Sequence, residues 1–321
     1  MPFKHPESSR DKFKKGRYKI TNWAEYTEGL CRRGDVTFWF SEEAIACWTP
    51  EKTGKRGRPR TYSDIAIETS LSLRLVFHLG LRQTEGFMRS VRRLLQVDIP
   101  IPDYSTLSER SDGLKMQSLS QSLQPGSHVI VDSSGLKVYG AGEWHQIKHN
   151  LKKRRVWNKL HLAVDEKHQV IASTLTTHHE SDESQVPFLL EQLEAPFDIF
   201  LADGAYDGKP TYEAIEKVNS HARIIIPPPK NAVISEKAKG ALLQRNQHIQ
   251  MIREYGVMEW QRRTGYGIRS HSELAFFRYK KIIGPRMRAR TLPRQQTEAK
   301  IGCSILNKMT SLGMPVSVRV A

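Results

Sequence analysis

Three acidic residues occupy positions where a carboxylate could take part in catalysis. Asp132 ends the apolar run HVIV, and Asp203 ends the apolar run IFLA. Glu273 lies among cations in the stretch YGIRSHSELAFFRYK, residues 266 to 280. A carboxylate at the end of a buried strand is partly desolvated, which is unfavourable unless a cation or several hydrogen bonds compensate. Either Asp alone is also compatible with a residue that begins a turn, because glycine follows closely after both.

The spacing around Glu273 favours a functional reading of these acids. If residues 266 to 280 are helical, Tyr266, Arg269, Glu273 and Lys280 fall within a sector of about 60°. Carboxylates can bind a divalent metal that activates a water or a 3′ hydroxyl, while Arg and Lys bind neighbouring phosphates. The pattern therefore indicates phosphoryl transfer on nucleic acid. The alternative is that Glu273 is only a salt-bridge partner of Arg269 or Lys280.

The composition of the chain agrees with a nucleic-acid partner. The 321 residues include 50 Lys and Arg against 34 Asp and Glu, which gives a formal charge of +16. Such an excess of positive charge favours binding to a polyanion. The three cysteines are scattered, so we expect reduced thiols rather than a zinc site or a disulfide. No signal peptide and no membrane-spanning apolar stretch is present, so we expect a soluble, cytoplasmic protein.

Alternation and turn signals predict the elements that must position these residues. Strands are expected at 128–140, 156–165 and 169–177 as an antiparallel meander, followed by a helix at 185–193, a strand at 198–204, a helix at 212–218 and a strand in ARIIIPPP. A basic, partly helical insertion at about 227–262 precedes the last helix. This order predicts one mixed α/β sheet covered on both faces.

The region before the sheet contains a candidate DNA-binding part. Residues 52 to 63 read KTGKRGRPRTYS, in which Arg56-Gly57-Arg58-Pro59 is similar to an AT-hook core and Arg60 follows. Such arginines enter a narrow minor groove, although a solvated basic linker has the same composition. Helices are expected at 63–79, 83–95 and 103–110. They are compatible with a helix-turn-helix reader of DNA or with a plain helical bundle.

Taken together, the sequence blocks resemble a DDE transposase of the IS-five family of bacterial insertion sequences. That group is marked by the order Tyr, two residues, Arg, three residues, Glu, six residues, Lys, and Tyr266, Arg269, Glu273 and Lys280 match it in full. The resemblance extends to DSSGLKVYGAGEW, KLHLAVD, LADGAYD and QQTEAKIGCSILNKM.

The resemblance implies an RNase H-like catalytic domain with a metal-binding triad. Asp132, Asp203 and Glu273 would bind Mg²⁺ or Mn²⁺, with two ions expected. Tyr266, Arg269 and Lys280 would contact DNA near the transposon end. We expect an N-terminal segment of unclear role at 1–55, a helical DNA-binding domain at 56–125, the catalytic domain at 126–290 and a C-terminal helical tail at 291–321.

The function expected from the resemblance is transposition. The protein would bind the terminal inverted repeats of its element, cleave there and join the 3′ ends to target DNA, acting on double-stranded DNA at the nucleoid as a homodimer or larger assembly. An RNase H-like nuclease without strand transfer is one alternative. A DNA-binding regulator with a vestigial site is another, although the presence of all three acids argues against it.

Overall fold

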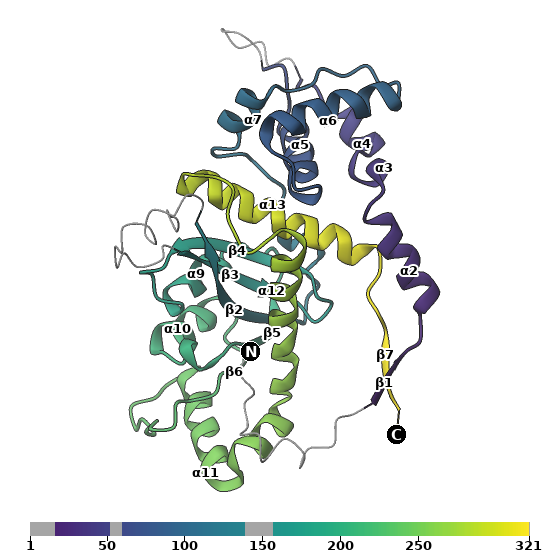
Figure 1. Ribbon diagram of the computed structural model, residues 1–321. Coiled ribbons are helices and arrows are strands. Elements are labelled where there is room, and N and C mark those ends of the chain that lie inside the picture. Colours follow the sequence, from purple (N-terminus) through teal and green to yellow (C-terminus); the bar gives the residue numbers. More distant parts are fainter. Residues whose placement is uncertain (1–16, 52–59, 139–156, 321) are drawn as a thin grey trace, which may run out of the picture.

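The structure is a computed structural model that describes residues 17–51, 60–138 and 157–320. A group of helices lies above a sheet that is flanked by further helices (Figure 1). The upper helices are α3 (Val36–Trp39), α4 (Glu42–Ala46), α5 (Asp64–Val76), α6 (Leu81–Leu94) and α7 (Tyr104–Arg110), whereas α2 (Trp23–Arg32) lies lower, beside the end of the C-terminal helix (Figure 1). The later helices are α9 (Val186–Leu190), α10 (Lys209–Val218), α11 (Leu242–Thr264), α12 (Ser270–Ile282) and α13 (Leu292–Ser311), with short 3₁₀ turns η1 (Leu119–Ser122), η2 (Glu183–Gln185), η3 (Gly204–Tyr206) and η4 (Tyr266–Arg269).

The sheet has five strands in the order β4-β3-β2-β5-β6. Their bounds are β2 (Ser127–Lys137), β3 (Trp157–Val164), β4 (Val170–Thr177), β5 (Phe197–Leu201) and β6 (Arg223–Ile225). Strand β3 is antiparallel to both β2 and β4, whereas β5 is parallel to β2 and β6 to β5. The predicted antiparallel meander and mixed α/β sheet are confirmed, and the arrangement fits an RNase H-like core.

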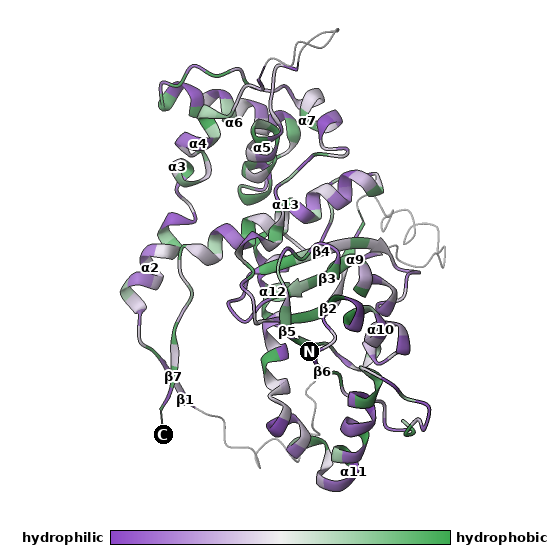
Figure 2. Ribbon diagram, turned by 180° about the vertical axis from the view of Figure 1, so that it is seen from behind, coloured by the Kyte–Doolittle hydropathy of each residue, from purple (hydrophilic) through white to green (hydrophobic). Residues whose placement is uncertain are grey.

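Strand β2 is the central strand, and its two faces differ in what they contact. Val129 and Val131 belong to the apolar cluster beneath α9 and α10. Ile130 belongs to a separate cluster with residues of α11 and η4. Because side chains alternate along a strand, Asp132 lies on the same face as Ile130. The strands are correspondingly hydrophobic in Figure 2. Asp132 follows directly after the apolar run HVIV.

The upper helices begin where local capping signals predict. Ser63 caps α5, and its hydroxyl accepts a hydrogen bond from the Ala66 amide at 3.1 Å. Asp103 caps α7 in the same manner through the Thr106 amide, at 2.8 Å. A side chain that satisfies an otherwise unbonded amide favours a helix start at that residue. The three helices expected between residues 63 and 110 are thereby confirmed as helices.

One apolar core joins the upper helices to the sheet. It runs from Leu71 and Leu75 of α5 through Ile301 and Ile305 of α13 to Leu160 of β3. Helix α13 lies between the two parts and contacts both (Figure 1). The helical region and the C-terminal helix are therefore packed as one body.

The N-terminal segment, whose role is unclear from sequence, contributes to this core. Trp39, Phe40 and Trp48 are buried, and the Trp48 indole donates a hydrogen bond to the Pro100 carbonyl at 2.6 Å. Strand β1 (Arg17–Ile20) pairs with β7 (Ser317–Val320) in an antiparallel ribbon. The early part of the chain is thus fastened to its last residues.

The segment 266–280 differs from the single helix expected. Residues Tyr266–Arg269 form the 3₁₀ turn η4, and the α-helix α12 begins only at Ser270. Gly265 ends α11 in the left-handed region at φ 74°, which breaks the helical path before η4. The common sector expected for all four signature residues therefore applies only to Glu273 and Lys280.

The predicted insertion is helical from Leu242, and α11 bends at Gly256, where φ is 81°.

Candidate active site

Asp132, on the central strand β2, accepts hydrogen bonds from three groups. Its Oδ1 accepts a hydrogen bond from the Ser133 amide at 2.8 Å. Its Oδ2 accepts from Arg269 Nη1 at 3.0 Å and from Ser272 Oγ at 3.1 Å. Burial raises the pKa of Asp132, and the nearby charge of Asp203 adds to this effect. The charged form of Asp132 is consequently disfavoured without a compensating cation.

Asp203 reaches the same place from the neighbouring strand. In the parallel pairing of β2 and β5, Ile130 lies opposite Leu201, so Asp132 and Asp203 both come two residues after paired positions. Asp203 also caps η3, with its Oδ1 accepting from the Ala205 amide at 2.9 Å. Two strands far apart in sequence therefore deliver two carboxylates to one edge of the sheet.

Glu273 joins these acids through Arg269. Helix α12 lies against β2 and β3. Arg269 donates a hydrogen bond from Nη1 to Asp132 Oδ2 and another from Nη2 to Glu273 Oε1. The guanidinium also lies 5.9 Å from the ring centre of Tyr266. One arginine is thus shared between two of the three predicted catalytic acids.

Electrostatics at Arg269 favour its positive charge. Burial acts against that charge, but Tyr266, Asp132 and Glu273 outweigh it and raise the pKa of Arg269. Tyr266 itself is only 8% exposed and packs against Trp260, with ring centres 5.1 Å apart. Burial and the neighbouring carboxylates raise the pKa of Tyr266 to about 12, so its hydroxyl remains a hydrogen-bond donor at neutral pH.

Lys280 continues the positive charge along β2. Its ammonium donates a hydrogen bond to Ser134 Oγ at 2.7 Å, and Ser134 lies on the same face of β2 as Asp132. Seven residues separate Lys280 from Glu273, which corresponds to about 10 Å along the helix. Burial lowers the pKa of Lys280. Lys280 therefore contacts β2 next to the three acids and forms no hydrogen bond with them in the described residues.

The donor set fits a hard divalent cation. Carboxylate oxygens are the ligands that Mg²⁺ takes in proteins, and a cation would offset the disfavoured charge of Asp132. Across residues 17–51, 60–138 and 157–320, no three acidic, histidine or cysteine side chains form a ready metal-binding group. Arg269 supplies the local positive charge between Asp132 and Glu273 instead.

Some residues of the site were not identified from the sequence. Ser272 bonds Asp132, and Ser134 bonds Lys280. Tyr206 is buried near the acids; burial raises its pKa, and the charges of Asp182, Asp132 and Asp203 add to the shift. The sequence signal that could have identified Tyr206 is its position shortly after Asp203, within the block LADGAYD.

Of the basic residues predicted before α5, only Arg60 is within the described residues. Arg56 and Arg58 are outside the described residues. Arg60 is exposed just before α5, where its Nη1 lies 3.9 Å from Asp64 Oδ1. Arg60 therefore belongs to the upper helical part and not to the cluster around Asp132.

Comparison with known families decides the class of protein. A family model described as a transposase DDE domain matches residues 123–308, more than half of the chain. This chain belongs to the transposase DDE domain family. A second model with the same description matches residues 31–141 of this transposase. DDE domains generally use divalent metal ions, which agrees with the carboxylates described above.

A solved structure of another transposase shows a weak likeness. The cryo-EM structure of the piggyBac transposase synaptic complex with hairpin DNA has a TM-score of 0.25 and 10% sequence identity. The match covers 92% of this chain and 84% of that chain. A TM-score this low does not establish a shared overall fold. Within the described part of this DDE transposase, no helix is both long enough and apolar enough to cross a membrane.

Proposed function

We propose that this protein is an IS-five family transposase that moves its own insertion sequence. It binds the terminal inverted repeats, cleaves DNA at the element ends and joins the 3′ ends to target DNA at the nucleoid. The observation that carries the proposal is the meeting of Asp132 and Asp203 at one sheet edge, with Glu273 tied to Asp132 through Arg269. The full match of the Tyr-Arg-Glu-Lys spacing supports the family assignment.

In this proposal Asp132, Asp203 and Glu273 hold Mg²⁺ or Mn²⁺, with two ions in the complete site. Bound ions would activate a water or a 3′ hydroxyl and stabilise the leaving oxygen. Ser133 and Ser272 orient Asp132 through their hydrogen bonds. This leaves the chain itself to place the carboxylates and to hold the phosphates next to them.

Arg269 has two uses in the proposed cycle. Without DNA it neutralises Asp132 and Glu273. A guanidinium fork binds carboxylate and phosphate with the same geometry, so Arg269 can exchange its carboxylates for a DNA phosphate. Tyr266 packs against Arg269 and offers a protonated hydroxyl, and Lys280 adds a second cation along β2. These three residues are the proposed contacts near the transposon end.

Recognition of the element ends is assigned to the helical region at 56–125. Arg56, Arg58 and Arg60 would enter the minor groove, and α5, α6 and α7 would supply the reading surface. Because two ends must be brought together, the DNA-bound form is proposed to be a homodimer or larger.

A strand-transfer assay tests this function. Labelled element ends, a supercoiled target and Mg²⁺ are incubated with the wild-type protein and with Asp132→Asn and Asp203→Asn. Joined products are expected from the wild type, while both variants should bind ends without cutting. Asp198→Asn, an exposed acid on β5, is the matched control and should cut normally. Cleavage without joining would favour a nuclease, and binding without cleavage by the wild type would favour a regulator.

A further inference from the structure

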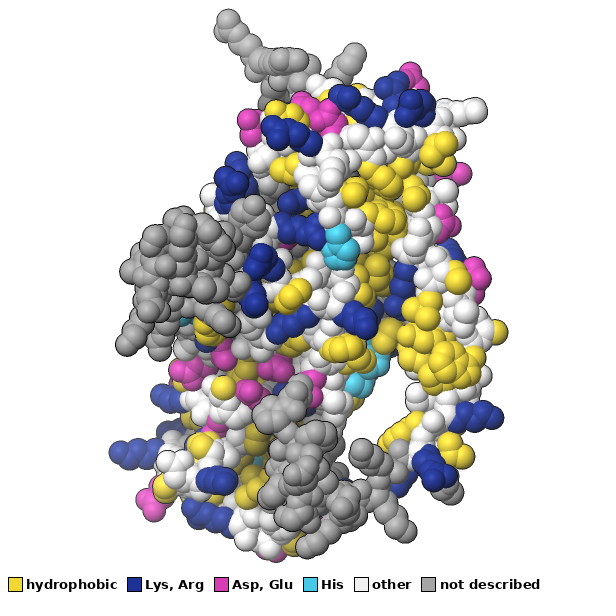
Figure 3. All heavy atoms as spheres, viewed as in Figure 1, with side chains coloured by type: hydrophobic (Ala, Val, Ile, Leu, Met, Phe, Trp, Pro, Cys, Tyr) yellow, Lys and Arg dark blue, Asp and Glu magenta, His cyan; other side chains and the backbone are white. Residues whose placement is uncertain are grey.

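A cavity lies between the upper helices and the loop that connects α12 to α13. Its volume is about 570 Å³. Its walls contain no acidic side chain, and four arginines line it, namely Arg74, Arg288, Arg290 and Arg294. In Figure 3, Lys and Arg side chains also gather across the middle of the face shown, and a group of acidic side chains lies below them. The cavity is therefore a concentration of positive charge separate from the carboxylate cluster.

Two of the arginines, Arg288 and Arg294, are held by neutral partners. Arg288 donates to the carbonyls of Arg74 and Leu79, at 3.4 and 3.3 Å, and its other terminal nitrogen lies 2.5 Å from His78 Nδ1. Arg294 donates to Ser108 Oγ at 3.2 Å. Within the described ranges, no carboxylate forms an ion pair with Arg74, Arg288 or Arg294. The guanidinium groups of Arg288 and Arg294 are therefore held in place by neutral hydrogen-bond partners.

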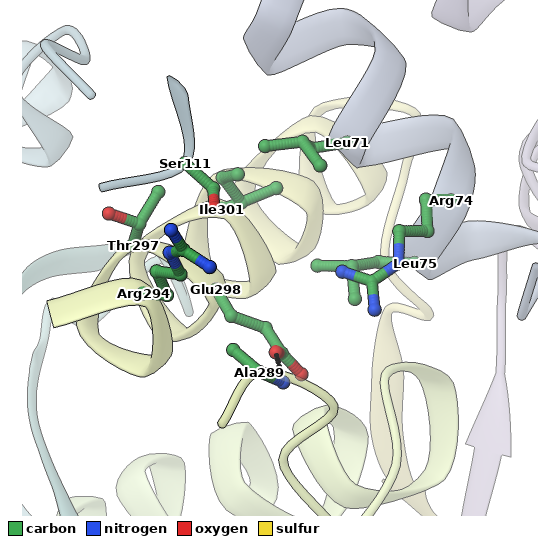
Figure 4. A pocket seen from close by; sticks show the side chains of 9 residues that line it. All are labelled: Leu71, Arg74, Leu75, Ser111, Ala289, Arg294, Thr297, Glu298 and Ile301. Atoms are coloured by element: carbon green, nitrogen blue, oxygen red, sulfur yellow. Dashed lines mark hydrogen bonds between the residues drawn. The ribbon is translucent and has the colours of Figure 1, made fainter. Parts of the chain in front are cut away.

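Glu298 is attracted to Arg74 and Arg288, but one carboxylate offsets only part of the charge of four arginines. Glu298 lies in a small inner chamber of about 20 Å³ that continues the cavity. Its carboxylate accepts hydrogen bonds from the backbone amides of Arg288 and Ala289, at 2.8 and 2.7 Å. Figure 4 shows Glu298 beside Ala289. The Nε atoms of Arg74 and Arg294 are buried without a hydrogen-bond partner. Partly buried cations are stabilised when an anion joins them, so the cavity is suited to an anionic ligand.

The loop that carries Arg288 is fastened to the strand that carries Asp132. The Lys137 amide donates to the Pro285 carbonyl at 2.9 Å, and the Met287 amide donates to the Lys137 carbonyl at 2.8 Å. Five residues of β2 separate Asp132 from Lys137, a distance of about 17 Å along an extended strand. Lys280 bonds to Ser134 in this interval. Lys280 therefore places a cation between the acids and the loop that lines the cavity.

We propose that this arginine cavity binds backbone phosphates of the same DNA whose end lies at Asp132, Asp203 and Glu273. The inference rests on the proposed function, because it assigns a second contact to the transposase substrate. Planar guanidinium groups bind phosphate oxygens in pairs, and several arginines suit successive phosphates of one strand. At about 3.4 Å per base pair, the 17 Å interval corresponds to about five base pairs. The cavity would set the distance between the cut and the phosphates that the arginines bind.

The first test measures the salt dependence of binding to an end duplex. The double variant Arg290→Gln/Arg294→Gln should lower the slope of log K against log salt by about 1.8, since each lost phosphate contact removes about 0.9. Arg17→Gln/Arg319→Gln removes the same charge from the exposed β1–β7 ribbon and should leave the slope unchanged. Arg294→Lys keeps the charge and should keep the slope. Thermal melting establishes that each variant is folded.

The second test replaces single phosphates by uncharged methylphosphonates. In the wild type, neutralising phosphates about five base pairs from the cut should weaken binding several-fold, whereas the double variant should be insensitive at those phosphates. Equal slopes and equal sensitivity in both proteins would refute the inference. Inorganic phosphate that stabilises the wild type but not the variant, with DNA binding unchanged, would show a small-anion site instead. A wild-type protein that bound no DNA would overturn the proposed function itself.

Discussion

Arg269 joins two carboxylates that would repel each other if both stayed charged without a cation. Its contacts with Asp132 and Glu273 make it a stabilising partner in the protein alone and a competitor of any metal ion. Arg269 has 21% and Glu273 has 32% of its side chain exposed. Water therefore screens this pair, and its contribution to stability is small.

The amide substitution of Glu273 separates its catalytic role from its ion-pair role. Glu273→Gln should abolish metal-dependent cleavage while DNA affinity and its salt dependence stay unchanged. The free energy of unfolding should change by only about 0 to 1 kcal/mol, because the pair is partly exposed. Glu254→Gln, an exposed acid on α11, is the control. Substantial Mg²⁺-dependent cutting by Glu273→Gln would leave Glu273 as a salt-bridge residue only.

Lys280 and its neighbour Lys281 provide a matched pair at consecutive positions. Lys280 points along β2 to Ser134, whereas Lys281 is exposed and lies about 100° around the helix. Lys280→Ala should weaken binding to element ends and reduce the slope of log K against log salt by about one unit. Lys281→Ala should have little effect in the same binding titrations. Equal losses in the two variants would point to general charge rather than to a phosphate contact at Lys280.

At the scale of elements, the contact between α12 and α13 depends on a glycine. A Cβ added at Gly302 would lie 2.6 Å from the ring of Tyr279, whereas a Cβ at Gly86 in α6 meets nothing within 4 Å. Gly302→Ala should therefore destabilise the protein by about 1–3 kcal/mol through overpacking. Gly86→Ala should stabilise it by about 0.5–1 kcal/mol through helix propensity. Urea unfolding of both variants decides this, and a stabilising Gly302→Ala would mean that Tyr279 moves aside freely.

A buried histidine between β3 and β4 makes the stability of the folded protein depend on pH. His161 is fully buried, with Nε2 2.9 Å from Thr176 Oγ1. Burial lowers the pKa of His161 to about 4, so the folded protein holds the ring neutral while the unfolded chain takes up a proton near pH 6.5. The unfolded state thus binds more protons between these values, and stability falls as pH drops from about 6.5 to about 4.

Replacing His161 should remove part of this loss. Between pH 7 and pH 4, His161→Gln should lose less unfolding free energy than the wild type, by on the order of 3 kcal/mol. Urea unfolding at the two pH values measures this difference. His168, whose pKa burial also lowers to about 4, remains in both proteins and cancels in the comparison. Identical losses in both proteins would show that His161 is not the titrating group.

At the scale of the whole molecule, the shared core makes the helical region depend on the rest of the chain. Leu71 and Leu75 of α5 pack in the same cluster as Ile301 and Ile305 of α13. A fragment ending at Gly126 lacks α13 and would expose this surface to water, at about 25 cal/mol for each Å².

We therefore expect the fragment 1–126 to melt without a cooperative transition, while the full chain unfolds cooperatively. Circular dichroism during heating tests this, with amide hydrogen exchange as the second measurement. A sharp transition and protected amides in the fragment would show that α5, α6 and α7 fold alone. Binding of element ends is consequently best measured on the full chain.

The sequence by itself determined the local elements and the residues of the catalytic signature. The caps at Ser63 and Asp103, and the apolar run that ends at Asp132, are signals carried by a few neighbouring residues. The spacing from Tyr266 to Lys280 also lies within one short segment, so the resemblance could be identified without a fold. The helix predicted through residues 266–269 was wrong because the positive φ of Gly265 redirects the backbone into a 3₁₀ turn.

Only the tertiary structure decided which distant residues meet. The register of β2 with β5 brings Asp132 beside Asp203, and the packing of α12 on β2 lets Arg269 reach both Asp132 and Glu273. The arginine cavity is likewise made from α5, the α12–α13 loop and α13. No local pattern predicts such contacts, because they form when apolar surfaces far apart in the chain are buried together, and the polar side chains beside them are carried into place.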